Sequence, residues 1–188
     1  MDSYLRQTVN ALKILKEIRV VASPSTGLPS YVSELVGAQS TITFSGLNGA
    51  SELEYRVMGR ILNTATNDTQ IMRFNGVSSN VYDYNYSQLG STGGNRTGSA
   101  TSYIEINIST GSSSIELWDL RVMANTGVNR GVLMQTTRGG ASQNGFSATY
   151  AGAGNWRNSV DAITSITFGY GSISNGYGIG TIIRLYAI

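Results

Sequence analysis

The chain closes with Thr181-Ile182-Ile183-Arg184-Leu185-Tyr186-Ala187-Ile188, and this stretch predicts the fold more clearly than any other part of the sequence. Successive side chains of a strand point to opposite faces. One face of this segment would therefore carry Ile183, Leu185 and Ala187, and the other would carry Arg184 and Tyr186 between two isoleucines. We expect a strand that is paired inside a sheet, which is how a terminal segment is held in place.

The same alternation recurs back along the chain as far as residue 41. Leu53, Tyr55 and Val57 alternate with charged side chains, as in a half-buried strand. Asn-Gly pairs at 48–49 and 75–76 are turn signals between such segments. The pattern predicts a mainly β protein, an antiparallel β-sandwich of the jelly-roll type over residues 40–188. The candidate strands are residues 41–47, 52–62, 69–74, 81–88, 103–108, 115–123, 132–137, 146–150, 163–170 and 179–188.

Residues 1–22 follow a helical pattern instead. Apolar side chains recur there at helical spacing and form a wide arc, while Arg6, Lys13 and Glu17 lie opposite. We predict an N-terminal α-helix that serves for attachment or oligomerisation; packing on its own domain and binding to a membrane surface are the alternatives. Residues 23–39 hold both prolines and are expected to be a linker with room for one short helix. The expected interface consists of Leu5, Val9, Leu12, Leu15 and Ile18.

The composition excludes several kinds of chemistry. The 188 residues include no His and no Cys, which excludes His-based acid–base catalysis, cysteine nucleophiles, disulfides and ordinary zinc sites. The formal net charge of +2 is too small to indicate nucleic acid as a partner. No apolar stretch approaches the roughly 20 residues of a membrane span, and none resembles a signal peptide. We therefore expect no cofactor, no metal, no membrane insertion, and folding in a reducing cytoplasm.

Three segments of the β region form an ordered set. They are Leu53–Val57; Met72–Gly76 followed by Tyr82-Asp83-Tyr84; and Asp161–Phe168 leading into the closing strand. The set resembles a jelly-roll-type domain of tail-fibre, head-fibre and capsid-decoration proteins of tailed phages. That family shows an L-R-F-N-G strand and turn, then a Tyr-bearing strand, and it ends on I-R-L-Y-G-I. Ala187 stands here where Gly is more usual.

The resemblance implies a non-enzymatic structural protein displayed on the virion surface and synthesised in the host cytoplasm. Such a protein is a capsid decoration or head fibre, or else a tail-fibre subunit. Domains of this type are commonly trimeric, so a homotrimer bound to other virion proteins is expected. The resemblance covers residues 41–188, and attachment would fall to the N-terminal helix.

Two alternative functions stay open at this point. An adhesin could bind a host surface glycan, because aromatic rings stack on sugar rings; its candidate contacts are Tyr150, Trp156, Tyr170 and Tyr177. A polysaccharide-degrading tail protein needs two carboxyl groups about 5 to 10 Å apart. Glu52 and Glu54 share a strand face, but Arg56 follows on that face and favours an ion-paired surface. We therefore expect no enzyme.

Overall fold

The structure is a computed structural model that describes residues 13–64, 68–90, 94–109, 114–139, 146–172 and 176–188. These residues form thirteen strands in two sheets and no helix, so none of them forms a helix long and apolar enough to span a membrane. The prediction of a mainly β protein is confirmed. In chain order the strands are β1 (Lys13–Val21), β2 (Val32–Val36), β3 (Thr41–Ser45), β4 (Glu54–Asn63), β5 (Asp68–Phe74), β6 (Tyr82–Gly90), β7 (Gly94–Thr101), β8 (Ile104–Ser109), β9 (Ser114–Met123), β10 (Arg130–Gly139), β11 (Phe146–Trp156), β12 (Ser165–Tyr170) and β13 (Ile182–Ala187).

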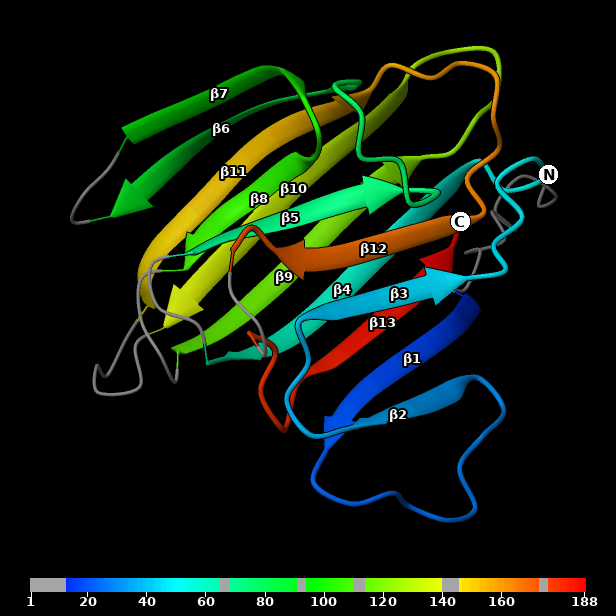
Figure 1. Ribbon diagram of the computed structural model, residues 1–188, viewed down its shortest axis with the longest axis vertical. Coiled ribbons are helices and arrows are strands. Elements are labelled where there is room, and N and C mark those ends of the chain that lie inside the picture. Colours follow the sequence, from blue (N-terminus) through cyan, green and yellow to red (C-terminus); the bar gives the residue numbers. More distant parts are fainter. Residues whose placement is uncertain (1–12, 65–67, 91–93, 110–113, 140–145, 173–175) are drawn as a thin grey trace, which may run out of the picture.

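The smaller sheet lies across one face of the larger one (Figure 1). The large sheet has nine strands in the order β2-β1-β13-β4-β9-β10-β11-β6-β7, and the small sheet has four in the order β3-β12-β5-β8. Neighbouring strands are antiparallel except for β1 and β2, which run parallel. The expectation of a purely antiparallel structure is therefore wrong at this one pair.

The closing strand takes the position that its sequence predicts. β13 lies between β1 and β4, with partners on both sides. Ile183 and Leu185 are fully buried, whereas Arg184 and Ile188 are exposed. One face of β13 therefore contributes to the core and the other faces outward, as the alternation indicates.

The core fills the space between the two sheets. Trp118 of β9 packs against Phe168 of β12 with ring centroids 5.3 Å apart, and Phe74 of β5 packs against Trp156 of β11 at 5.4 Å. Each pair joins one strand of the small sheet to one of the large sheet. Aromatic side chains bury large areas and dominate core energetics, so these contacts hold the sheets face to face.

The prediction of an N-terminal helix is wrong for residues 13–21, which form β1. Ile18 and Val20 of this strand are buried in the core between the sheets. The segment is rich in β-branched residues, which favour strands, and a long-range partner in β13 supplies the hydrogen bonds that a helix would make internally. Leu15 packs partly buried against the same core. Leu5, Val9 and Leu12 lie outside the described residues.

The predicted linker also differs. Residues 32–36, expected to be loop or a short helix, form β2, which pairs with β1 from Glu17 to Val21. β1 and β2 therefore belong to the same large sheet as the strands after residue 40, and no boundary separates them from it. Residues 94–101, which belong to none of the strands predicted from the sequence, form β7 at the far edge of that sheet.

Candidate functional site

The outer face of the large sheet, the face turned away from the small sheet, is the strongest candidate for a functional surface. Alternation along β4, β9 and β10 points every second side chain outward. Met58, Leu117 and Leu133 lie at such positions and are 38%, 44% and 49% exposed. The register joins these strands directly, with Met58 opposite Asp119 and Asp119 opposite Gln135. Large apolar side chains therefore stand uncovered in the middle of the sheet, within the described part of the chain.

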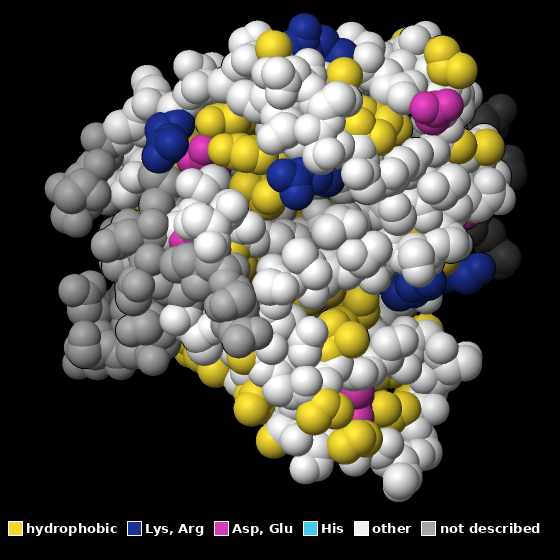
Figure 2. Space-filling view, viewed as in Figure 1, with side chains coloured by type: hydrophobic (Ala, Val, Ile, Leu, Met, Phe, Trp, Pro, Cys, Tyr) yellow, Lys and Arg dark blue, Asp and Glu magenta, His cyan; other side chains and the backbone are white. Residues whose placement is uncertain are grey.

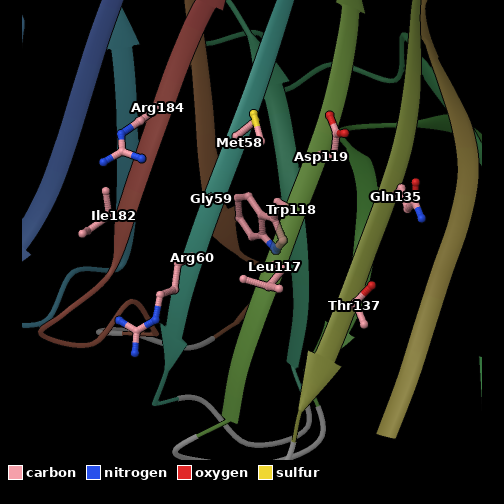
Figure 3. A pocket seen from close by; sticks show the side chains of 10 residues that line it. All are labelled: Met58, Gly59, Arg60, Leu117, Trp118, Asp119, Gln135, Thr137, Ile182 and Arg184. Atoms are coloured by element: carbon pink, nitrogen blue, oxygen red, sulfur yellow. The ribbon is translucent and has the colours of Figure 1, made fainter. Parts of the chain in front are cut away.

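This face is hollowed between β13 and β10. A cavity of about 490 Å³ opens there, and a second of about 350 Å³ lies beside it toward β11. Figure 3 shows the lining of the first cavity, contributed by four neighbouring strands. Its lining side chains are Met58 and Arg60 of β4, Leu117, Trp118 and Asp119 of β9, Gln135 and Thr137 of β10, and Ile182 and Arg184 of β13, with Gly59 at the backbone.

The charges on this face are paired across strands. Arg56 donates two hydrogen bonds to Asp119, at 2.8 and 2.6 Å. These bonds outweigh the partial burial of Asp119 and lower the pKa of its carboxyl below the ordinary value. Glu54, one of the two acids weighed for hydrolysis, lies 3.6 Å from Arg121 of β9. The expectation of an ion-paired surface is thus met, although Arg56 pairs with β9.

A second ion-paired group lies on β1 and β13. Glu17 accepts hydrogen bonds from both Arg19 and Arg184. Burial raises the pKa of Glu17, but the two guanidinium groups outweigh it and hold the pKa below the ordinary value. The outer face thus presents Arg, Met and Leu side chains, and its carboxylates Glu17, Glu54 and Asp119 are each paired with an arginine. Protein interfaces are enriched in Met and Arg, so this chemistry suits contact with another protein surface.

The aromatic side chains expected to contact glycan do not lie on the surface. Tyr150, Trp156 and Tyr177 are buried to 99% or more, and Tyr170 is 8% exposed. Tyr170 and Tyr177 pack edge to face at 4.8 Å, and Tyr150 packs against Tyr86 at 5.7 Å. The assignment of these four residues as glycan contacts is wrong, because they face the interior. The sequence predicts that these residues lie near strand ends and loops, but it does not predict whether their side chains point to the core or to solvent.

A buried polar cluster lies inside, between β5, β8 and β9, and the sequence did not indicate it. Asn107 donates to Glu116 at 3.2 Å, and Trp118 donates to the same carboxyl at 3.4 Å. Burial raises the pKa of Glu116, and these hydrogen bonds only partly oppose the shift. Gln70 donates to the hydroxyl of Tyr170 at 2.8 Å. Among the described residues, one oxygen each of Gln70, Asn107 and Glu116 has no hydrogen-bond partner.

A second buried carboxylate holds β6 against β8. Tyr84 and Tyr86 donate to Glu105 at 2.8 and 2.6 Å, and Arg96 lies 3.0 Å from it. Burial, together with the nearby carboxylate, raises the pKa of Tyr84 to about 12. Alternation along residues 103–108 suggests that Glu105 and Asn107 face solvent, yet both are buried. β8 is thus covered on both faces, which a period-two pattern cannot reveal.

The arrangement offers no assembled catalytic centre in the described part of the chain. Glu105 accepts hydrogen bonds from two tyrosines, Glu116 from Asn107 and Asp68 from Ser172, and no group of three or more acidic side chains is placed to hold a metal ion among the described residues. No protein-family model and no curated protein matches this sequence.

Proposed function

We propose that this chain is a non-enzymatic structural subunit displayed on the surface of a tailed-phage virion, built on a jelly-roll β-sandwich and assembled with copies of itself. The capsid-decoration or head-fibre role and the tail-fibre role share the same fold, and both fall within the proposal. The buried aromatic residues leave the glycan-adhesin alternative without its candidate contacts, and no observation favours a polysaccharide-degrading protein.

The observation that carries the proposal is the nesting of strand pairs. If β2, β6, β7, β10 and β11 are set aside, eight strands remain. The first of these eight strands pairs with the last, the second with the second to last, and so on. The four pairs are β1 with β13, β3 with β12, β4 with β9 and β5 with β8, and all are antiparallel. A chain doubled into one long hairpin gives this nesting.

Two further pairs roll that hairpin into two sheets. β13 also pairs with β4, and β12 also pairs with β5. The eight strands thereby divide into β1-β13-β4-β9 and β3-β12-β5-β8. Eight strands in two sheets with Greek-key connections are the plan of the jelly roll, which is common in viral capsid and lectin domains. The five extra strands all extend the large sheet, which makes its outer face unusually wide.

Two of the segments that carry the family resemblance, residues 72–84 and residues 161–168, contact each other in this plan. Asn75, in the turn after β5, donates to the carbonyl of Ala162 at 2.8 Å and accepts hydrogen bonds from the backbone of Thr164 and Ser165 at 2.8 and 3.1 Å. Tyr82 donates to Val77 and Phe74 in the same region. The R-F-N-G turn and the segment leading into β12 are therefore one interlocked unit. This supports the resemblance as a similarity of fold, and the virion role is inferred from it.

Self-assembly is supported by the surfaces that the described chain leaves open. The outer face of the large sheet carries exposed Met and Leu side chains among paired arginines, and protein interfaces are enriched in Met and Arg. Open sheet edges also need covering, and closed rotational symmetry is the usual arrangement of such contacts. We infer a homotrimer in which the outer face contributes to the interface, and in which residues 1–12 contribute to attachment.

Light scattering on the purified chain tests the assembly part of this proposal. We expect a mass close to three times the 20.0 kDa of one chain at micromolar concentration. The double variant Leu117→Glu and Leu133→Glu places two carboxylates on the outer face and should lower that mass, while circular dichroism shows an unchanged fold. The matched control is Val160→Glu, at a turn residue that is 82% exposed, which should leave the mass unchanged. A wild-type monomer would contradict the proposal.

A further inference from the structure

A groove runs along the open edge of the small sheet, between β3 and strands β1 and β2. Figure 1 shows where these three strands lie. Its volume is about 330 Å³. Ile18 and Leu35 provide apolar lining from the large sheet, and Thr41, Thr43 and Ser45 line it from β3. Figure 2 shows hydrophobic side chains gathered over the β1–β2 part of this view, on a face that is otherwise mostly uncharged.

Alternate residues of β3 direct backbone groups that do not pair with β12 into this groove. Lys16 reaches across it and donates to the carbonyl of Ser45, so that carbonyl points away from β12. Ser165 of β12 lies opposite Ser45, and its carbonyl accepts a hydrogen bond from the backbone N–H of Asn75 rather than from β3. The backbone groups of Ser165 and Ser45 therefore point away from each other. In an antiparallel pair, alternate residues direct both N–H and C=O to the same edge. The N–H and C=O groups of Thr43 and Thr41 are therefore directed into the groove as well.

No strand covers this edge within the described part of the chain, because β3 is the last strand of its sheet. Lys16 satisfies only one of its acceptors. An open edge beside an apolar floor fits the addition of an extended segment, which gains main-chain hydrogen bonds from the edge and side-chain burial from the floor.

We propose that the groove binds residues 5–11 of a second copy of this chain, added as a strand to β3. In this segment Leu5, Gln7, Val9 and Ala11 alternate with Arg6, Thr8 and Asn10, so that one face is apolar except for Gln7. One face therefore matches the buried Ile42 and Phe44 of β3, and the other matches its exposed threonines.

The geometry favours a second copy over the chain's own N-terminus. β1 itself forms part of the groove from Lys16 onward. To place residues 5–11 in its own groove, a chain must reverse direction between Ala11 and Lys13, where Ala-Leu-Lys offers none of the Gly, Pro, Asn, Asp or Ser that tight turns use. A second copy needs no such turn, and the twelve residues before β1 can span up to about 40 Å.

This inference deepens the proposed assembly role and rests on it for the expectation that copies associate. Because the chain has no Cys, an engineered disulfide can test it without background. The full-length double variants Thr8→Cys with Thr43→Cys, and Asn10→Cys with Thr43→Cys, cover two registers of the added strand. After mild oxidation we expect most of at least one variant to migrate as disulfide-linked dimers or trimers on a non-reducing gel. Mass spectrometry should identify the disulfide between residue 8 or 10 of one copy and residue 43 of another.

The control pairs Thr8→Cys with Val128→Cys, an exposed residue of the loop between β9 and β10. It should form at least tenfold less of the linked species, and all variants should melt as the wild type does under reducing conditions. A bond to residue 43 within one chain, or no bond in either register, would overturn the inference. If light scattering still gives a trimer in that case, only the binding of residues 5–11 to β3 is refuted, and the proposed assembly stands.

Discussion

At the scale of single residues, Glu116 is the side chain with the clearest consequence. It is fully buried, and burial raises its pKa above the ordinary value. A folded-state pKa above the unfolded one, about 4.3, means that the folded state binds the proton more tightly. Its contribution to stability is therefore complete below that pH and is lost as the pH rises through the folded pKa. We expect Glu116→Gln to remove this loss.

The measurement is urea unfolding of both proteins from pH 4 to pH 8. The free energy of unfolding of the wild type minus that of Glu116→Gln should fall across this range, by about 1.4 kcal/mol for each unit of pKa shift. Taking the difference cancels the opposite contributions of Glu17 and Asp119, whose pKa values are lowered. A difference that stays constant or rises with pH would show that Glu116 is ionised in the folded protein without cost.

Asn75 provides a second prediction at this scale. It has φ of 52°, in the left-handed region, and its side chain bonds to three backbone groups between residues 162 and 165. Asn75→Gly keeps the backbone conformation and loses the bonds, so we expect a loss of about 2 kcal/mol. Asn75→Ala should lose about 1 kcal/mol more, because Ala disfavours positive φ. Thermal melting that separates neither variant from the wild type would show that the turn does not fasten β5 to β12.

The turn at Asn75-Gly76 could be predicted from the sequence, whereas the buried polar cluster around Glu116 could not. Asn75-Gly76 is a turn signal because both residues tolerate positive φ, a purely local property. The cluster around Glu116 depends on side chains from strands far apart in the sequence, so no local pattern could reveal it. The four aromatic residues expected to meet glycan fail for the same reason, since strand position does not say which face is covered.

At the scale of elements, β13 is the strand on which the large sheet depends. It joins β1 to β4 and buries Leu185 completely. Truncation of a buried Leu to Ala typically costs about 2–5 kcal/mol. We therefore expect Leu185→Ala to lower the free energy of unfolding by this amount. Ile188→Ala, at a position 42% exposed on the same segment, should change it by about 0.5 kcal/mol or less. Equal effects would contradict the assignment of the two faces.

The contrast between β13 and β1 explains which elements the sequence could predict. β13 alternates strictly, so its type and buried face could be deduced from eight residues. In β1 the apolar residues Ile14, Leu15 and Ile18 fit helical spacing as well as strand spacing. Its structure is decided by pairing with β13, where the Glu17–Arg184 bond joins residues 167 positions apart. Tertiary pairing of this range overrides local propensity.

At the scale of the whole molecule, the nesting of strand pairs depends on contacts between strands that are far apart in the sequence. Alternation predicted most of the strands but not the order in which they pair. The five extra strands widen one sheet only, and their outer face was not distinguished in the sequence from ordinary solvent-facing positions. The wide face and the open edge of β3 are the two surfaces on which the proposed assembly rests.

The most direct measurement locates the chain on intact particles. Because the chain has no Cys, Val160→Cys introduces a single handle at a turn residue that is 82% exposed. Phage particles produced with this variant in place of the wild-type chain would be labelled with maleimide-coated gold and imaged by electron microscopy, with wild-type particles as the control. The account predicts gold at regular sites on the head or along the tail of intact particles. Particles that contain no copy of the chain, or that take up gold only after disruption, would contradict it.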